Sequence, residues 1–403
     1  HEIAWTRRLL GLGLLLVACQ SPPVERSPNA GTGASTNAAG SAEAPPSASA
    51  VPPIVPPNSL SEGEFTRLFH ELSEPDRYFF SDNFVSNETS YLQPIAELSA
   101  RAAKGGAYLG VGPEQNFSYL ALLEPKLAFI VDIRRANALE HLLYKAIFEA
   151  ATSRSHFVAL LLARDYDAET DPGPSAPIKA VLAHATRSTP DPKRFSELHA
   201  MLVKKLQSKG LSFEAEDQKT LTATHRAFFD RGLELSFELH DKNGRKYPRL
   251  SELLSAEDSR GSTGFLGTEA AFRAVQQLQR DNRIIPVVGD FAGDHAILRI
   301  AAELRRRALP VSVFYTSNVE QYLMEPDKWK AWTRNVEALP SNEKSLFLRC
   351  YLDQGRRHPL QLQGHRTATV VASFDHFKWR NKTRGYGSFF QLVTDGLGAD
   401  AGH

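Results

Sequence analysis

Short apolar runs that end in polar residues alternate along much of the chain with stretches that suit helices. Four such runs are typical of buried strands: 107–112, 127–132, 283–288 and 311–315. Three stretches that follow them suit helices: 115–123, 137–150 and 295–308. Strands that alternate with helices in this way predict an α/β fold with a doubly wound, mostly parallel sheet.

The pattern differs at the two ends and in the middle of this body. A helix is expected over 60–72, where apolar residues fall on one face. Near the C-terminal end, 345–351 and 368–374 suit two more strands, expected as an antiparallel pair at one edge of the sheet. A largely helical, polar insertion is expected over about 152–283, between the second strand at 127–132 and the third at 283–288. Within it, 233–239 is strand-like and precedes a hairpin turn.

The beginning of the chain has the pattern of a secretory signal. Arg7 and Arg8 precede an apolar run at 9–17, which is far shorter than the roughly 20 residues that span a bilayer. The run ends in small residues before Cys19, and this arrangement resembles the lipobox of bacterial lipoproteins, in which the cysteine is lipidated. By the same resemblance, Gln20 after the cysteine favours the outer membrane. We therefore expect a lipid-anchored protein of the bacterial cell envelope.

A segment rich in proline, alanine and serine, without aromatic residues, separates this signal from the α/β body. Such a composition buries too little apolar surface to offset the entropy of ordering. The predicted layout has four parts: a signal peptide at 1–18, a lipidated Cys19 and disordered linker at 19–58, an α/β domain at 59–398 and a flexible tail at 399–403.

The charge and the cysteine content limit which partners, disulfides and metal sites are expected. Lys and Arg number 47 against 46 Asp and Glu, which leaves a net charge of +1, so no nucleic-acid partner is expected from a global field. The two cysteines, Cys19 and Cys350, cannot form a disulfide framework or a cysteine-rich zinc site. Cys350 lies in an apolar run and is expected to be buried. No metal is expected, because no metal-binding motif occurs.

Candidate chemistry gathers where the expected strands end, since ligands of open α/β sheets bind beyond the carboxyl ends of parallel strands. Four of these ends are polar: Gly110 to Asn116 with Gly112, Asp132, Gly289-Asp290, and Ser317-Asn318-Val319-Glu320. Asn87 and Glu88, in a polar segment before the first of these strands, are expected to fold over the same crevice. These residues are the candidate ligand site.

The Gly110-Val-Gly112 turn, with Asp132 22 residues after its first glycine, resembles the class I S-adenosylmethionine-dependent methyltransferase family over roughly 80–150 and 280–376. The resemblance implies a Rossmann-like fold of the methyltransferase type and S-adenosylmethionine as cofactor. It implies that the two glycines let the backbone approach the cofactor and that Asp132 accepts hydrogen bonds from the ribose hydroxyls. It also implies that Asp290 lies where the family's fourth strand delivers polar residues to the transfer site.

Two positions depart from that pattern, because Glu114 stands in place of the third glycine and Tyr108 in place of the acid that often opens the motif. Structural roles are open as well. The glycines can serve a tight turn, Asp132 can pair with Arg134 or Arg135 or cap the next helix, and a helix N-terminus can partner Asp290. Asn318 and Glu320 can cap a helix.

Two functions follow from these patterns. One is a tethered envelope protein that binds S-adenosylmethionine or a similar nucleoside ligand and transfers its methyl group to a nucleophile near Asp290 or Asn318. The other is a non-catalytic envelope binding or scaffold protein that keeps the fold. An open cavity at the strand ends favours the first, whereas a crevice filled by Phe117, Tyr119 or Phe291 favours the second. The sequence does not indicate substrate or oligomeric state.

Overall fold

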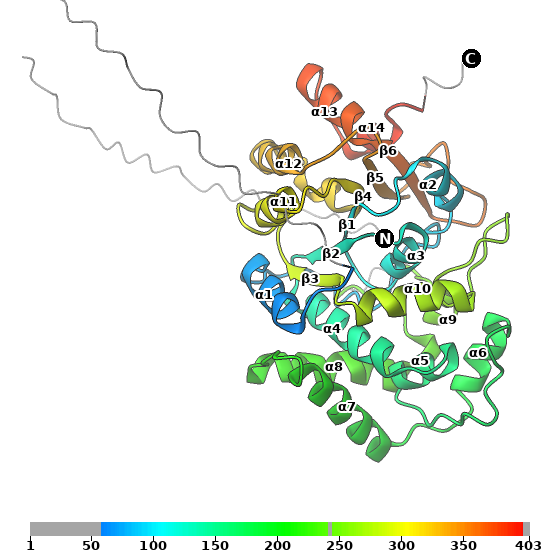
Figure 1. Cartoon of the computed structure of the whole chain (residues 1–403). Helices are drawn as coiled ribbons and strands as arrows, with labels where there is room; N and C mark the ends of the chain where they lie inside the picture. Colours follow the sequence, from blue (N-terminus) through cyan, green and yellow to red (C-terminus); the bar gives the residue numbers. More distant parts are fainter. Residues whose placement is uncertain (1–57, 241–243, 398–403) are drawn as a thin grey trace, which may run out of the picture. The chain divides into compact units, whose positions relative to one another are not determined.

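A computed structural model describes residues 58–240 and 244–397. The predicted signal peptide, Cys19 and all but the last residue of the linker lie outside the described residues. The centre of the described body is a six-stranded sheet (Figure 1) in the order β3-β2-β1-β4-β5-β6. The strands are β1 (Ala107–Gly110), β2 (Leu127–Asp132), β3 (Ile284–Val288), β4 (Val311–Ser317), β5 (Leu346–Leu352) and β6 (Thr367–Ser373).

The pairing agrees with the predicted sheet. β1, β2, β3, β4 and β5 run parallel, and β6 pairs antiparallel with β5 at the edge, from Leu346 opposite Ser373 to Leu352 opposite Thr367. Nearly every residue of these strands is buried, as expected when helices cover both faces of a parallel sheet. The expected α/β class, with a mostly parallel sheet, is confirmed, and the strand order is the one described for doubly wound sheets.

Two groups of helices enclose the sheet (Figure 1). On one side, α1, α11, α12 and α13 pack in succession; on the other, α3, α10 and α4 pack together. Their bounds are α1 (Glu62–Leu72), α3 (Gln115–Leu123), α4 (Arg135–Ala150), α10 (Glu269–Arg280), α11 (Ala296–Arg306), α12 (Pro326–Ala338) and α13 (Phe374–Thr383). Short elements complete the body: α2 (Ile95–Arg101), η2 (Val319–Leu323) and α14 (Phe389–Thr394).

The insertion lies between α4 and β3 and is largely helical, as predicted. Besides α10, it comprises α5 (Arg154–Leu161), α6 (Ile178–Ala185), α7 (Pro192–Gln207), α8 (Ala215–Arg231), η1 (Gly232–Glu234) and α9 (Leu250–Leu254). α5, α7, α8 and α10 pack against α4. The expected strand over 233–239 is wrong: this stretch opens with the 3-10 turn η1 and makes only single bridges, at Ser236 and Leu239. Leu235 and Phe237 bury their side chains without a partner strand.

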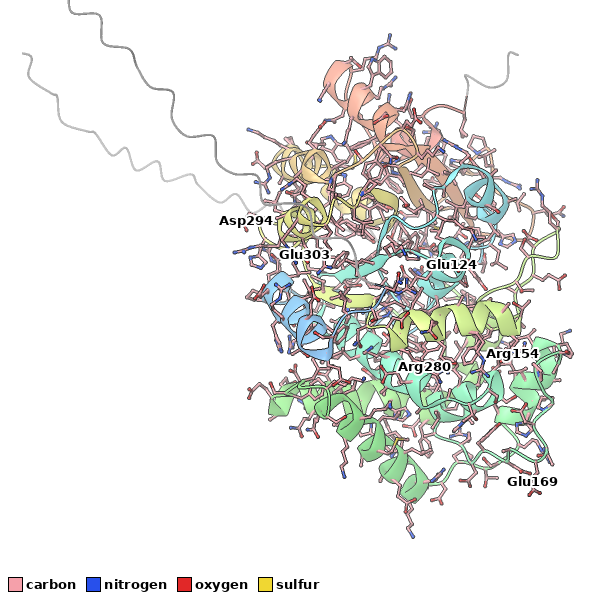
Figure 2. All side chains as sticks on the ribbon, in the orientation of Figure 1. Glu124, Arg154, Glu169, Arg280, Asp294 and Glu303 are labelled. Atoms are coloured by element: carbon pink, nitrogen blue, oxygen red, sulfur yellow. The ribbon has the colours of Figure 1, made fainter. Side chains whose placement is uncertain are left out.

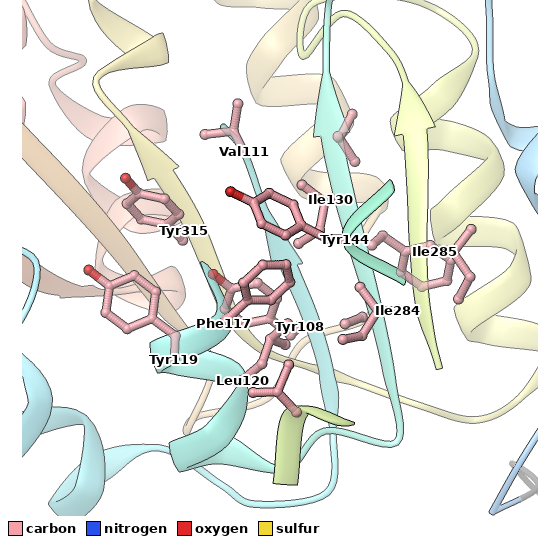
Figure 3. Close-up of a cluster of buried hydrophobic side chains, with 14 of the residues drawn as sticks. Tyr108, Val111, Phe117, Tyr119, Leu120, Ile130, Tyr144, Ile284, Ile285 and Tyr315 are labelled. Atoms are coloured by element: carbon pink, nitrogen blue, oxygen red, sulfur yellow. The ribbon is translucent and has the colours of Figure 1, made fainter. Parts of the chain in front are cut away.

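Aromatic and aliphatic side chains fill the layer between the sheet and α3 and α4. Figure 3 shows Tyr108 and Ile130 from neighbouring strands with Phe117 of α3 and Tyr144 of α4. The Phe117 ring meets that of Tyr144 edge-on at a centroid distance of 5.1 Å. Pairs of this kind add about 0.5–1.5 kcal/mol to the gain from burial. This packing fixes α3 and α4 beneath the strand ends.

Charged side chains are mostly at the surface. Glu169 and Asp294 lie at the outside in Figure 2, and both are exposed, as is Glu124. Arg154, labelled in the same view, is buried instead, and its guanidinium donates to the carbonyls of Leu266 and three further residues of the insertion. In the described part of the chain, the longest apolar helices fall short of what a membrane crossing requires.

Candidate functional site

A cavity of about 550 Å³ opens at the carboxyl ends of the parallel strands. Its wall includes residues that follow β1, β2, β3, β4 and β5. The segment that precedes α2 and part of the insertion complete the wall on the other side. The strand order reverses between β1 and β4, and ligands of doubly wound sheets bind at such a switch point. The cavity therefore lies where the sequence predicts a ligand site.

The structure brings six of the eight predicted site residues together in this wall. They are Asn87, Glu88, Gly112, Asp132, Asp290 and Asn318. Gly110 and Glu320 are outside it. Phe117 and Tyr119, which were expected to fill the crevice of a scaffold protein, are buried in the core away from the cavity, and Phe291 lines the wall without closing it.

The two glycines of the turn after β1 have different surroundings. A Cβ on Gly110 would lie 2.0 Å from Oδ1 of Asn116, whose Nδ2 donates to the carbonyls of Val111, Gly112 and Pro113 and so ties the turn together. Gly112 has a φ of +77°, and a Cβ there would meet nothing closer than 3.4 Å. Gly110 thus serves close packing, whereas Gly112 serves a left-handed turn at the cavity wall.

Asp132, at the end of β2, pairs with Arg134 at two points. Oδ1 accepts from Nε of Arg134 at 3.0 Å and from its backbone N–H at 2.9 Å, and Oδ2 accepts from Nη2 at 2.9 Å. Both side chains are nearly buried. Of the two expected arginine partners, Arg134 is the one the structure gives; Arg135 pairs with Asp217 of α8 at 2.5 Å. Asp132 does not cap α4, which begins without a side-chain cap.

Asp290 is held by the segment that follows α1. Its Oδ2 accepts from Nη1 of Arg77 at 2.9 Å, and its Oδ1 accepts from the backbone N–H of Ala292 at 2.9 Å. The N–H of Asp290 in turn donates to Oε1 of Glu74 at 2.6 Å. Because α11 begins only at Ala296, the expected partner at a helix N-terminus is replaced by an arginine and a turn.

The residues after β4 divide into one that lines the cavity and one that does not. Asn318 lines the wall and precedes η2 without capping it. Glu320 is fully buried, and its carboxylate accepts from Arg349 at 2.5 and 3.0 Å and from the indole of Trp332 at 3.1 Å. Every oxygen of Glu320 is therefore used inside the fold, which indicates a structural role.

Glu88 forms a hydrogen-bonded chain with β4. Its Oε1 accepts from the phenol of Tyr315 at 2.7 Å and from the hydroxyl of Ser317, and Tyr315 accepts from Nε2 of Gln115 at 2.8 Å. Burial raises the pKa of the Glu88 carboxyl, and the hydrogen bonds from Ser317 and Tyr315 act in the opposite direction. Gln115 was predicted only as part of the polar turn from Gly110 to Asn116, and Tyr315 is not among the predicted site residues. A tyrosine, rather than a phenylalanine, within an apolar strand is the signal that could have found Tyr315.

More titratable groups are buried beneath the turn. Burial raises the pKa of Glu114 to about 7, although the backbone N–H of Ser86 donates to its carboxylate. Burial lowers the pKa of His141 to about 4, and its Nε2 lies 2.8 Å from the carbonyl oxygen of Gly112. Since that oxygen only accepts, the neutral imidazole carries its proton on Nε2. Perturbed pKa values of this kind cluster at functional sites, though buried structural groups show them too.

Aromatic side chains line the part of the cavity nearest to solvent. Phe79 and Phe80 stack with ring centroids 4.2 Å apart, and Tyr322 of η2 lies 6.0 Å from each. Phe80 is 39% exposed and Tyr322 is 41% exposed, although both line the cavity. These three residues form an aromatic rim, which offers planar apolar surface to a ligand.

A second cavity, of about 480 Å³, adjoins the first. The two share Asn87, Arg245, Tyr247 and Leu352 in their walls. Lys246 and Arg366 also line the second cavity. Within residues 58–240 and 244–397, no three His, Cys, Asp or Glu side chains come together closely enough to hold a metal ion.

Comparison with known protein families gives one assignment for this body. The model of a family described as a domain of unknown function, DUF7790, matches residues 83–172 and 175–395. The match spans all six strands and the whole wall of the cavity except Phe79 and Phe80. No curated protein matches the chain. The sheet, the insertion and the strand-end cavity are thus features of a chain that belongs to the DUF7790 family.

Proposed function

We propose that this chain binds a small nucleoside-type ligand, such as S-adenosylmethionine, in the strand-end cavity. One observation carries the proposal: the cavity is open at the switch point of the sheet and has Gly112, Asp132 and Asp290 in its wall. Its volume of about 550 Å³ is within the range of about 300–1,000 Å³ that small-molecule sites occupy. The methyltransferase type of the fold is part of this proposal.

The residues present fit such a ligand in three ways. Gly112 has no side chain to keep a ligand from its backbone. Among the described residues, Arg134 alone donates to Oδ2 of Asp132, so this oxygen has capacity for a ribose hydroxyl. The aromatic rim offers rings on which a nucleobase can stack. Arg134 then acts as a positioning residue that fixes the orientation of the Asp132 carboxylate.

A methyl transfer extends this proposal. S-Adenosylmethionine supplies an electrophilic methyl group on a sulfonium. The chain's own part is to hold the nucleoside at Asp132 and to orient an acceptor near Asn318 and Asp290. Asn318 and Asp290 line the same cavity as Asp132, so the acceptor would enter that cavity beside the nucleoside. Phe291 adds an apolar ring to the wall and is held there by stacking on Trp332, with centroids 5.4 Å apart.

The alternative is a non-catalytic binding or scaffold protein of the envelope. A specific observation favours it: Glu114, which stands where the resembling family has its third glycine, is buried and bonded to Ser86. A side chain at that position changes the turn that would hold the cofactor. In this alternative the cavity keeps its shape and binds a different small molecule or none.

Calorimetric titration of the full chain with S-adenosylmethionine and S-adenosylhomocysteine tests the proposal. We expect micromolar binding to the wild type and at least roughly tenfold weaker binding to Asp132→Asn, which loses a charged acceptor. Asp217→Asn is a matched control, because Asp217 is a buried acid paired with an arginine but lies outside the cavity wall. If neither ligand binds the folded wild type, the scaffold alternative takes precedence.

We further propose that a lipid on Cys19 anchors this domain to the outer membrane through the linker that precedes the body. The support is the sequence pattern alone: a basic start, a short apolar run and small residues before the cysteine. Detergent phase partition of the full chain from bacterial cells tests the proposal. The wild type is expected in the detergent phase and Cys19→Ser in the aqueous phase.

A further inference from the structure

Glu88 is a buried carboxylate with one oxygen used and one unused. Its side chain is 1% exposed and lines the cavity. Oε1 accepts two hydrogen bonds, from Tyr315 and Ser317. Within the described residues, Oε2 has no hydrogen-bond partner. A buried acceptor left without a donor destabilises the fold, and it does so more strongly when it is charged.

Gln115 presents a second unused acceptor from the same hydrogen-bonded chain. The phenol of Tyr315 donates its only proton to Glu88, so it must accept from Gln115, and the amide nitrogen of Gln115 therefore points toward Tyr315. This leaves Oε1 of Gln115 as the other end of the amide, and that oxygen also lacks a partner among the described residues. Gln115 is 5% exposed and lines the cavity.

The charges around the cavity distinguish Glu88 from the other acids in its wall. Asp132 is paired with Arg134, and Asp290 with Arg77. Among the ion pairs of the described residues, none includes Glu88. The groups nearest to its carboxyl are the hydroxyls of Tyr315 and Ser317, which donate to Oε1, and the thiol of Cys350, a weak donor that leaves Oε2 without a hydrogen bond among the described residues. Over the described part of the chain, Glu88 is thus an acid of the wall that forms no ion pair.

We propose that Glu88 and Gln115 bind a primary ammonium group of the ligand that occupies this cavity. An ammonium group carries three N–H donors and a positive charge, so it satisfies both free acceptors and neutralises the carboxylate at once. A neutral hydroxyl would satisfy one acceptor, and a quaternary ammonium would supply the charge without donors. The inference rests on the proposed ligand-binding function of the cavity and narrows its ligand to an amine.

Glu88→Gln tests this directly, because the change keeps the shape of the side chain. Its Oε1 still accepts from Tyr315 and Ser317, whereas the free oxygen is replaced by an N–H₂ donor, which repels an ammonium. Glu114→Gln is the matched control: Glu114 is an equally buried acid of the same neighbourhood that is outside the cavity wall. Gln115→Met is a second variant, which removes the other acceptor and leaves Glu88 unchanged.

Two sets of probes separate this inference from the proposed function. The first compares S-adenosylmethionine with 5′-methylthioadenosine, which lacks the amino-acid part and its ammonium group. The second uses n-butylammonium, n-butanol and tetramethylammonium at millimolar concentration, so that it does not depend on a nucleoside. Binding to the full chain is followed by calorimetry and by thermal shift.

We expect Glu88→Gln to weaken binding of the amine probes by roughly tenfold or more and Gln115→Met to weaken it less, with Glu114→Gln like the wild type. n-Butanol and tetramethylammonium are expected to bind weakly to every variant. If amine probes bind equally to the wild type and Glu88→Gln, or fail to bind the folded wild type, the inference is overturned. If both adenosyl compounds bind and Glu88→Gln leaves their affinities unchanged, the amine inference is overturned as well, but the proposed function stands. If n-butylammonium binds and neither adenosyl compound does, the amine inference stands and the proposed nucleoside function fails.

Discussion

Asp132 and Arg134 are two residues apart and join their side chains at two points, 3.0 and 2.9 Å long, at the end of β2. The same guanidinium also donates to the carbonyl of Asp82 in the segment that covers the cavity. This pair therefore links the strand end to the cover. Asp132, the proposed ribose ligand, thus also holds two parts of the fold together, and experiments on it must separate the two roles.

Asp132→Ala is expected to destabilise the fold by about 3–5 kcal/mol, because it leaves the buried guanidinium of Arg134 without a counter-charge. The double change Asp132→Ala with Arg134→Met should cost clearly less, since no buried guanidinium is left without its partner. Urea unfolding followed by circular dichroism measures both. Asp230→Ala, which breaks the exposed pair with Arg226, should cost no more than about 0.5 kcal/mol. Equal losses for the single and the double change would contradict a structural role of the pair.

The two glycines of the turn should respond differently to alanine. Gly110→Ala places a Cβ 2.0 Å from Asn116 and 2.7 Å from Tyr108, so we expect little folded protein. Gly112→Ala meets no clash and loses only about 1 kcal/mol, for its left-handed backbone. Soluble yield and thermal unfolding of the two variants provide the comparison. A Gly110→Ala protein as stable as Gly112→Ala would show that the turn rearranges.

The aromatic rim should matter for ligands more than for stability. Phe80→Ala and Tyr322→Ala remove partly exposed rings, so each is expected to cost under about 1 kcal/mol of stability. If a planar group stacks there, each change should weaken its binding by about 0.5–1.5 kcal/mol. Titration with adenosine, next to thermal unfolding, measures both effects. Trp379→Ala, at an exposed ring outside the cavity, is the control.

Burial of His141 should make the fold sensitive to acid. The pKa of His141 is about 4 in the folded state, against an ordinary value of 6.5, so below pH 6.5 the unfolded chain binds the proton more readily. Stability should therefore fall as the pH drops from 6.5 to 4, by roughly 3 kcal/mol from this group. Urea unfolding at pH 7, 6 and 5 should show a smaller loss for His141→Gln than for the wild type.

Glu114 should make the stability of the fold depend on pH in the opposite direction. Its pKa of about 7 in the folded state exceeds the ordinary 4.5, so the folded state holds the proton more tightly, and stability from this group is lost as the pH rises from 4.5 through 7. Glu114→Gln stays neutral and still accepts from the N–H of Ser86. The variant should therefore gain stability relative to the wild type between pH 5 and pH 8. An unchanged difference over that range would mean that Glu114 is charged in the fold at no cost.

The strands and the helices that flank them could be predicted because their apolar periodicity is strong and local. The runs at 127–132 and 115–123 coincide with β2 and α3. The prediction of a strand over 233–239 was wrong because a strand needs a partner, and the periodicity of one segment does not show that its partner is missing. Polar strand ends likewise located the cavity, since topology alone brings them together.

The pairing of site residues was less predictable, because it depends on contacts between distant parts of the chain. Whether Asp132 selects Arg134 or Arg135 depends on where Asp217 of the insertion lies, 82 residues beyond Arg135. The chain from Glu88 to Tyr315 spans 227 residues. Glu320 shows the same difficulty: its place after β4 suggested a site, whereas its partner Arg349 comes from β5.

The wall of the strand-end cavity is assembled from segments that lie between residues 79 and 354. No fragment that ends before β5 carries all of it, so binding to the whole wall cannot precede the formation of β5. A compound that occupies the cavity will then resist the unfolding of the entire body by an amount that grows with the logarithm of its concentration. Screening compounds for an upward shift in melting temperature thus tests whether any of them binds this cavity, and it requires no knowledge of a reaction.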